Sequence, residues 1–179
     1  MTMIRDAQLS DCPQICSIYN YFIENSRATF EERQVEPSDI ASRVATLQKE
    51  LLWLVYEQQG EILGYAYVSP WKGRSAYRFS VESSIYVAHS AAGKGVGTQL
   101  YQALLNRLQD YPIATVIAGI ALPNPASVAI HERLGFHKVA EFEKVGRKFG
   151  EWVNVGYWQQ QIKTEQQIDE LEQEVLEEY

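Results

Sequence analysis

Cysteine, methionine and histidine are scarce in this sequence, and long apolar runs are missing. The 179 residues include 2 cysteines, 2 methionines and 3 histidines. So few cysteines and histidines exclude a disulfide scaffold and leave little material for a metal site. No stretch reaches the ~18 apolar residues of a membrane-spanning helix, and no apolar leader segment is visible. We therefore expect a cytoplasmic protein with no membrane partner and no metal.

The two cysteines are four residues apart in a predicted helix. Cys12 and Cys16 would place their Cβ atoms about 5–6 Å apart there, whereas a disulfide needs about 3.8 Å. Both are expected to be free thiols in the core of a protein from a reducing compartment.

Basic residues are outnumbered, with 16 Lys and Arg against 23 Asp and Glu, so the net charge is −7. That balance argues against nucleic acid as a partner. The 46% of hydrophobic residues suits one globular domain with a full core. We expect that domain over residues 1–163. Residues 164–179 read as an acidic helix or tail, docked weakly or packing on a second copy.

A strand, a glycine loop and a helix follow one another in the middle of the chain. The strand ends at Val87, Gly93-Lys-Gly-Val-Gly97 follows, and leucines then recur every four residues from Leu100. Glycines permit close approach of the backbone, and a helix N-terminus offers unpaired N–H groups. The arrangement predicts a phosphate site, although a plain tight turn remains the alternative. The spacing fits neither the Walker A loop nor the dinucleotide fingerprint.

An acidic residue stands in the middle of the strand predicted over 78–87. With a period of two, Glu82 shares one face with Arg78, Ser84 and Tyr86. A buried carboxylate must be paired or have a raised pKa. The two interpretations are an ion pair with Arg78 or another neighbour, and a general base.

Three further stretches carry candidate site residues. Residues 69–77 mix aromatic side chains with Lys72 and Arg74, which predicts either a solvated loop or a wall that recognises an anion. Residues 25–36 form a loop over the site mouth or a connector with Phe30 in the core. Asn124 begins a helix as its N-cap, which alone would explain it, and His131 lies two turns further on.

Several motifs resemble those of the GCN5-related N-acetyltransferases (GNAT). Gly95 and Gly97 fit the glycine slots of that family's pyrophosphate loop, [Q/R]-x-x-G-x-[G/A], although Ala92 occupies the Gln/Arg slot. N-P-A-S-V-A-I-H-E-R-L-G-F at 124–136 is similar to its closing motif. The order of predicted elements also agrees. The resemblance implies an α/β fold with a mixed, mostly antiparallel sheet of six to seven strands, helices on both faces and a splayed central strand pair.

Within that family the chain is most similar to the phosphinothricin and methionine sulfoximine N-acetyltransferases. Four blocks carry this likeness, W-K-G-R-S-A-Y at 71–77, V-E-S-S-I-Y-V at 81–87, L-P-N-P-A-S-V-A-I-H-E at 122–132 and G-E-W-V-N-V-G-Y-W at 150–158. Phe149, where some relatives have His, is a departure.

The resemblance implies a homodimer that moves the acetyl group of acetyl-CoA to the α-amine of a small amino-acid-like substrate. Glu82 matches the general base, and His131 the residue that protonates the sulfur or orients a water. The implied acetyl-CoA contacts are Ile85, Tyr86, Val87, Gly93, Lys94, Gly95, Val96, Gly97, Thr98, Asn124 and Ser127. The implied substrate contacts are Phe30, Lys72, Arg74, Tyr77, Arg78 and Val155.

Two other functions remain open at this point. The chain could acylate a different amine, such as a polyamine or a protein N-terminus, and an acidic site mouth without Lys72 and Arg74 would favour that. It could also be a non-catalytic acetyl-CoA sensor, which Ala92 permits and the Glu82–His131 pair argues against.

Overall fold

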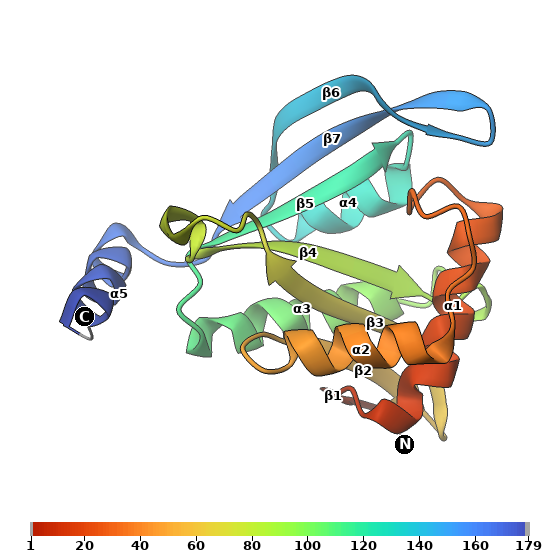
Figure 1. The fold of residues 1–179 in the computed structure, drawn as a ribbon, viewed down its shortest axis with the longest axis horizontal. Helices are drawn as coiled ribbons and strands as arrows, with labels where there is room; N and C mark the ends of the chain where they lie inside the picture. The colour runs from red at the N-terminus through yellow and green to blue at the C-terminus, as the bar shows by residue number, and fades with distance from the viewer. Residues whose placement is uncertain (1, 178–179) are drawn as a thin grey trace.

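The computed structural model describes residues 2–177, in which seven strands form one sheet of order β1-β2-β3-β4-β5-β7-β6 (Figure 1). All neighbours are antiparallel except β4 and β5, which run parallel. The strands are β1 (Thr2–Asp6), β2 (Trp53–Gln58), β3 (Glu61–Pro70), β4 (Ser80–Val87), β5 (Thr115–Leu122), β6 (His137–Lys148) and β7 (Glu151–Gln161). The helices are α1 (Cys12–Asn25), α2 (Pro37–Leu47), α3 (Val96–Arg107), α4 (Pro125–Arg133) and α5 (Glu165–Glu177).

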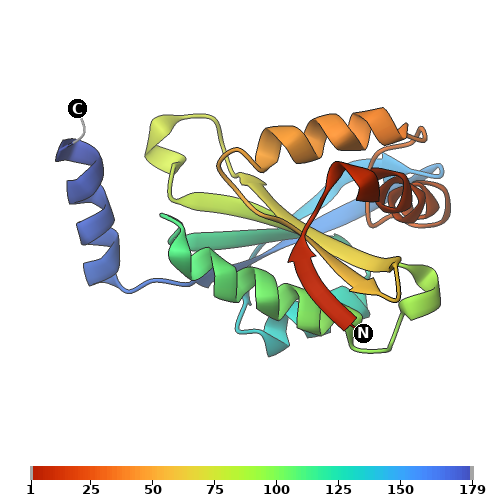
Figure 2. The ribbon, with the colours of Figure 1, turned by 90° about the horizontal axis from the view of Figure 1, so that it is seen from below.

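Helices cover both faces of the sheet, as the resemblance implied (Figure 2). Helices α1 and α2 bury residues such as Ile15 and Val44 against Trp53 and Tyr65 of β2 and β3. On the opposite face, α3 and the segment that follows α4 pack on the central strands through residues that include Leu104 and Phe136. Burial of these apolar side chains is the main force that holds the layers together.

Element boundaries lie close to those expected from the sequence. The hairpin between β2 and β3 turns at Gln59 and Gly60, which both have positive φ, 54° and 84°. Two positive φ angles are typical of the tight turn that matches strand twist. The second helix ends at Leu47. Cys12 and Cys16 are buried free thiols.

The central parallel pair separates after a short ladder, which confirms the predicted splay. Strands β4 and β5 pair only from Ser80–Thr115 to Glu82–Ile117. Beyond these residues the two strands diverge toward their C-terminal ends (Figure 1). The hydrogen-bonded ladder between β4 and β5 is therefore interrupted in the middle of the sheet.

The C-terminal helix α5 projects away from the domain (Figures 1 and 2). Its described contacts with the body include an ion pair from Arg78 to Glu172 at 3.1 Å. The expected helix over residues 164–179 is therefore seen from Glu165 to Glu177, and residues 178–179 lie outside the described part. Over residues 2–177, no helix combines the length and apolar character needed to cross a membrane.

Candidate active site

The opening between β4 and β5 is a hollow whose walls come from both strands and from α4. Residues 83–87 line one side, Gly119 to Ala121 line the other, and Ser127 and His131 reach it from α4. The opposite edge of β4 pairs with β3 as far as Val87. The edge of β4 that faces the opening continues past the ladder, so its backbone groups are available to a ligand there.

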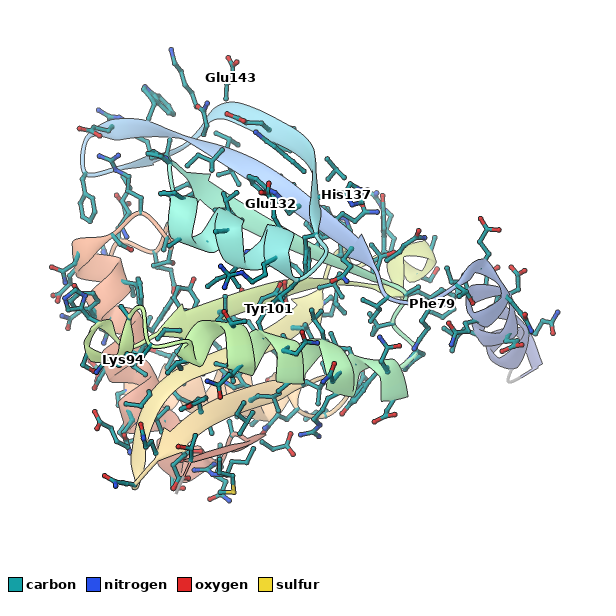
Figure 3. The ribbon with its side chains drawn as sticks, turned by 180° about the vertical axis from the view of Figure 1, so that it is seen from behind. Phe79, Lys94, Tyr101, Glu132, His137 and Glu143 are labelled. Carbon is teal, nitrogen blue, oxygen red and sulfur yellow. The ribbon has the colours of Figure 1, made fainter. Side chains whose placement is uncertain are left out.

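The glycine loop follows β4 and leads into α3. Gly93 and Gly95 have φ values of 74° and 79°, and Gly95 is the N-cap of α3. A Cβ on Gly97 would lie 3.3 Å from Ile130 Cδ1 and 3.4 Å from Val87 Cγ2. The missing side chain thus lets the first turn of α3 pack closely on β4 and α4. Lys94 is exposed on this loop (Figure 3).

The first turn of α4 uses Asn124 as expected from its capping pattern. The side-chain oxygen of Asn124 accepts a hydrogen bond from the backbone N–H of Ser127 at 3.1 Å. Both residues also line the hollow between the strands. Asn124 therefore both caps α4 and lines the candidate site.

His131 is held in one tautomer within the same hollow. It is 3% exposed, and its Nδ1 lies 2.7 Å from the carbonyl oxygen of Ser127. A carbonyl only accepts, so Nδ1 carries the proton and Nε2 is left as an acceptor. Burial lowers the pKa of His131 below its usual value, against the opposing effect of the Ser127 carbonyl. The neutral ring is therefore favoured.

Glu82 of β4 lies in a second hollow, which residues of β5, β6 and β7 also line. Phe30, Val155 and Tyr157 share this hollow with it. Burial raises the pKa of the half-buried Glu82 carboxyl, and the charge of Lys72 offsets part of that effect. Among residues 2–177 Glu82 has no ion-pair partner, and Arg78 pairs with Glu172 instead. The alternative of a Glu82–Arg78 pair is wrong.

The two hollows meet at small residues that the sequence analysis did not single out. Ala28, Gly119 and Ala121 line both of them. A Cβ on Gly119 would lie 3.2 Å from Glu82 Oε1 and 3.2 Å from Tyr157 Cε1. A glycine inside a strand of branched residues is the available sequence signal for such a close approach.

Four of the expected substrate residues lie in the segment between β3 and β4, and they do not all point the same way. Lys72, Arg74 and Tyr77 are exposed, and Lys72 acts on Glu82 through its charge. Trp71 stands edge-on to Tyr157 at 5.7 Å between ring centroids, which brings this segment to the hollow of Glu82. Arg78, in contrast, is directed to the C-terminal helix.

The position of Phe30 decides between the two interpretations of the loop that precedes α2. Its side chain is 41% exposed and lines the hollow of Glu82. Arg27, Ala28 and Phe30 of this loop therefore border the hollow, and the alternative with Phe30 in the core is wrong. Tyr86 contributes to the hollow of the strand gap while its ring packs edge-on against Tyr19 at 5.2 Å.

Comparisons with known proteins show the family to which this chain is similar. The model of the acetyltransferase (GNAT) domain matches residues 4–155. A phosphinothricin N-acetyltransferase from Streptomyces viridochromogenes is 38% identical over 160 residues, which cover 89% of this chain and 87% of that protein. An L-methionine sulfoximine/L-methionine sulfone acetyltransferase from Pseudomonas paraeruginosa is 36% identical over 161 residues, covering 87% and 92%.

A solved structure shows the same fold. It is a GNAT superfamily phosphinothricin acetyltransferase from Sinorhizobium meliloti in complex with AcCoA, with a TM-score of 0.86 and 34% identity, covering 89% of this chain and 88% of that one. The chain belongs to the GNAT acetyltransferase family. It is accordingly an acetyl-CoA-dependent N-acetyltransferase.

Proposed function

We propose that this enzyme transfers an acetyl group from acetyl-CoA to the α-amine of a small amino-acid-like substrate of the phosphinothricin or methionine sulfoximine type. The observation that carries the proposal is the meeting of two hollows at Gly119, with Glu82 on the amine side. Direct transfer needs both substrates bound together. The names and identities of the relatives support this substrate class.

The residues present fit the thioester substrate. On the side of β4 that faces β5, no ladder pair involves Ile85 to Val87, and Gly93 has open space where a Cβ would point. These backbone groups would hold the pantetheine arm and polarise the thioester carbonyl. The N–H groups of the Gly93–Thr98 stretch, at the positive end of α3, would bind the pyrophosphate. The Ala92 departure removes one side chain and leaves this backbone cradle in place.

Glu82 supplies the base that the amine requires. A protonated α-amine has no free electron pair, so Glu82 takes the proton, directly or through a water. The amine nitrogen then forms the C–N bond and loses its second proton to solvent. The C–S bond breaks, and the electron pair of that bond goes to the sulfur. The raised pKa of Glu82 brings a carboxylate closer to the range in which it is an effective base.

His131 orients a water molecule that donates a hydrogen bond to the departing thiolate. Because Nδ1 donates to Ser127, the free Nε2 can accept a hydrogen bond but has no proton to give in the neutral ring. A water held by Nε2 would donate to the sulfur. Of the two roles inferred from the resemblance, the geometry supports the orientation of a water.

We assign substrate recognition to exposed cations and to aromatic and apolar side chains near the amine-side hollow. Lys72 and Arg74 would contact the side-chain anion or polar sulfur group, together with the exposed Tyr77. Phe30 and Val155 line the amine-side hollow. Arg favours bidentate capture of carboxylate or phosphinate. Arg78 pairs with Glu172, and we do not include it in this proposal.

A thiol-release assay tests the proposed function. Acetyl-CoA is supplied with phosphinothricin, methionine sulfoximine, methionine sulfone, spermidine and an alanine-led peptide. We expect release of CoA with the first three only. Preference for spermidine or for the peptide would establish the other acceptor class, and no release with any amine would favour a sensor.

We also propose that the enzyme is a cytoplasmic homodimer. The β6–β7 hairpin exposes large apolar side chains, among them Phe142 at 55%, Phe149 at 56% and Trp152 at 60%. Clustered apolar exposure of this kind is typical of an interface. Light scattering should give twice the chain mass for the wild type, and the monomer mass for Trp152→Glu. A monomeric wild type would contradict this part of the proposal.

A further inference from the structure

A fully buried lysine stands at the end of β6, a strand whose other residues are exposed or partly exposed. Lys148 is 1% exposed. Its Nζ donates hydrogen bonds to the carbonyl oxygens of Ser26 at 2.7 Å, Thr29 at 2.8 Å and Phe22 at 3.5 Å. In the described part of the chain this ammonium has no carboxylate in ion-pair contact. Its three N–H donors are matched by three backbone acceptors.

Those acceptors belong to the C-terminal end of α1 and the loop that follows it. Phe22 lies in the last turn of α1, and Ser26 is its C-cap. The Phe22 carbonyl also accepts a hydrogen bond from the backbone N–H of Ser26 at 3.1 Å. A cation is favourable at this negative end of a helix. Lys148 therefore holds together the end of a helix and a loop that has no regular structure of its own.

The loop over residues 26–30 is also a wall of the amine-side hollow. Arg27, Ala28 and Phe30 line it beside Glu82. Two more contacts join this loop to the same hairpin, since Arg27 pairs with Glu151 and the Phe30 ring lies against Gly146. The Arg27 pair is exposed and contributes little. Of these three contacts between the loop and the hairpin, the one made by Lys148 involves a fully buried side chain.

We propose that Lys148 is a positioning residue that fixes the loop over residues 26–30 as a wall of the amine site. This inference rests on the proposed function, in which the hollow of Glu82 receives the amine. Lys148 does not touch the reacting atoms, because its donors are directed to the three carbonyls. Without it the loop loses its buried anchor and Phe30 and Ala28 lose their fixed places.

Replacement by an apolar side chain of similar length separates this role from general stability. Lys148→Met should raise KM for the amine about tenfold or more and leave KM for acetyl-CoA within about twofold. Lys144→Met, an exposed lysine on the same hairpin, is the charge-matched control and should change neither. Lys148→Gln, which keeps donors for two carbonyls, should fall between Lys148→Met and the wild type.

Hydrogen exchange gives a readout that does not depend on activity. In Lys148→Met, faster amide exchange should be confined to peptides spanning residues 24–31, with the central strands protected as in the wild type. Equal changes in both KM values, no local change in exchange, or loss of the fold in both variants would overturn the inference. If the wild type acetylates none of the amines but the exchange change is local, the proposed function fails while the anchoring role of Lys148 stands.

Discussion

The hydroxyl of Ser83 on β4 donates to the carbonyl oxygen of Ile117 on β5 at 3.3 Å, one residue beyond the last ladder pair. In a continued parallel ladder this carbonyl would be bonded by the neighbouring backbone. A side chain takes that place instead, and the hydroxyl of Tyr101 from α3 bonds Ser83 in turn. At the point where the β4–β5 ladder ends, buried side-chain hydrogen bonds thus replace the backbone bonds of the sheet.

Removal of this hydrogen-bond pair should destabilise the protein in a coupled way. Ser83→Ala leaves the buried Tyr101 hydroxyl and the Ile117 carbonyl without a partner, at about 1–3 kcal/mol of unfolding free energy. The double variant Ser83→Ala/Tyr101→Phe should cost less than the sum of the single variants. Urea denaturation measures all three values. Additive costs would show that the two hydroxyls do not act together.

A methyl group at the junction of the two hollows should disable the enzyme. Gly119→Ala places a Cβ 3.2 Å from Glu82 Oε1 and from Tyr157 Cε1. The displaced carboxylate should lower kcat/KM for the amine roughly 10²-fold, while overpacking costs about 1–3 kcal/mol of stability. Steady-state kinetics and a melting curve decide between catalytic and folding effects. A folded variant with normal kcat/KM would place the amine elsewhere.

The charge of Lys72 should tune the pH at which Glu82 becomes active. Burial raises the pKa of Glu82 and Lys72 opposes it. A general base works deprotonated, so activity is lost as pH falls through this pKa. Lys72→Met should therefore move the acid limb of kcat/KM to higher pH. Lys49→Met, an exposed lysine, is the control, and an acid limb that stays in place for both variants would exclude the coupling.

Arg74 should distinguish anionic from neutral side chains. Loss of a charge-assisted hydrogen bond in Arg74→Ala should raise KM for phosphinothricin roughly tenfold and change KM for methionine sulfone much less. Arg107→Ala, which removes an exposed guanidinium paired with Asp6 on the surface, controls for net charge. Equal effects on both substrates would mean that Arg74 does not recognise the anion.

Much of the fold was predictable because local rules and tertiary packing agree. Period-two alternation put Glu82 and Tyr86 on the face opposite Val81, as the structure has them in separate layers. Asn124 and Gly95 follow capping and turn rules that operate over a few residues. These features depend on near neighbours in sequence.

The missed features depend on contacts between distant segments. Gly119 matters because β5 approaches Glu82 of β4, and the sequence does not encode which atoms face that glycine. Lys148 lies in a strand whose other residues are exposed or partly exposed, so the sequence pattern predicts an exposed side chain. The side chain is buried instead, because its ammonium bonds the carbonyls of Phe22, Ser26 and Thr29. Ser83 and Tyr101 likewise meet across two layers.

The pH dependence of kcat/KM for phosphinothricin in wild type and Glu82→Gln tests the central claim most directly. We predict that the wild type shows an acid limb above the ordinary carboxyl pKa, because burial raises the pKa of Glu82. Glu82→Gln should lose roughly 10²–10⁴-fold in kcat/KM and lose that limb, with KM for acetyl-CoA unchanged. Near-normal turnover in Glu82→Gln, or the same acid limb in both proteins, would contradict the account.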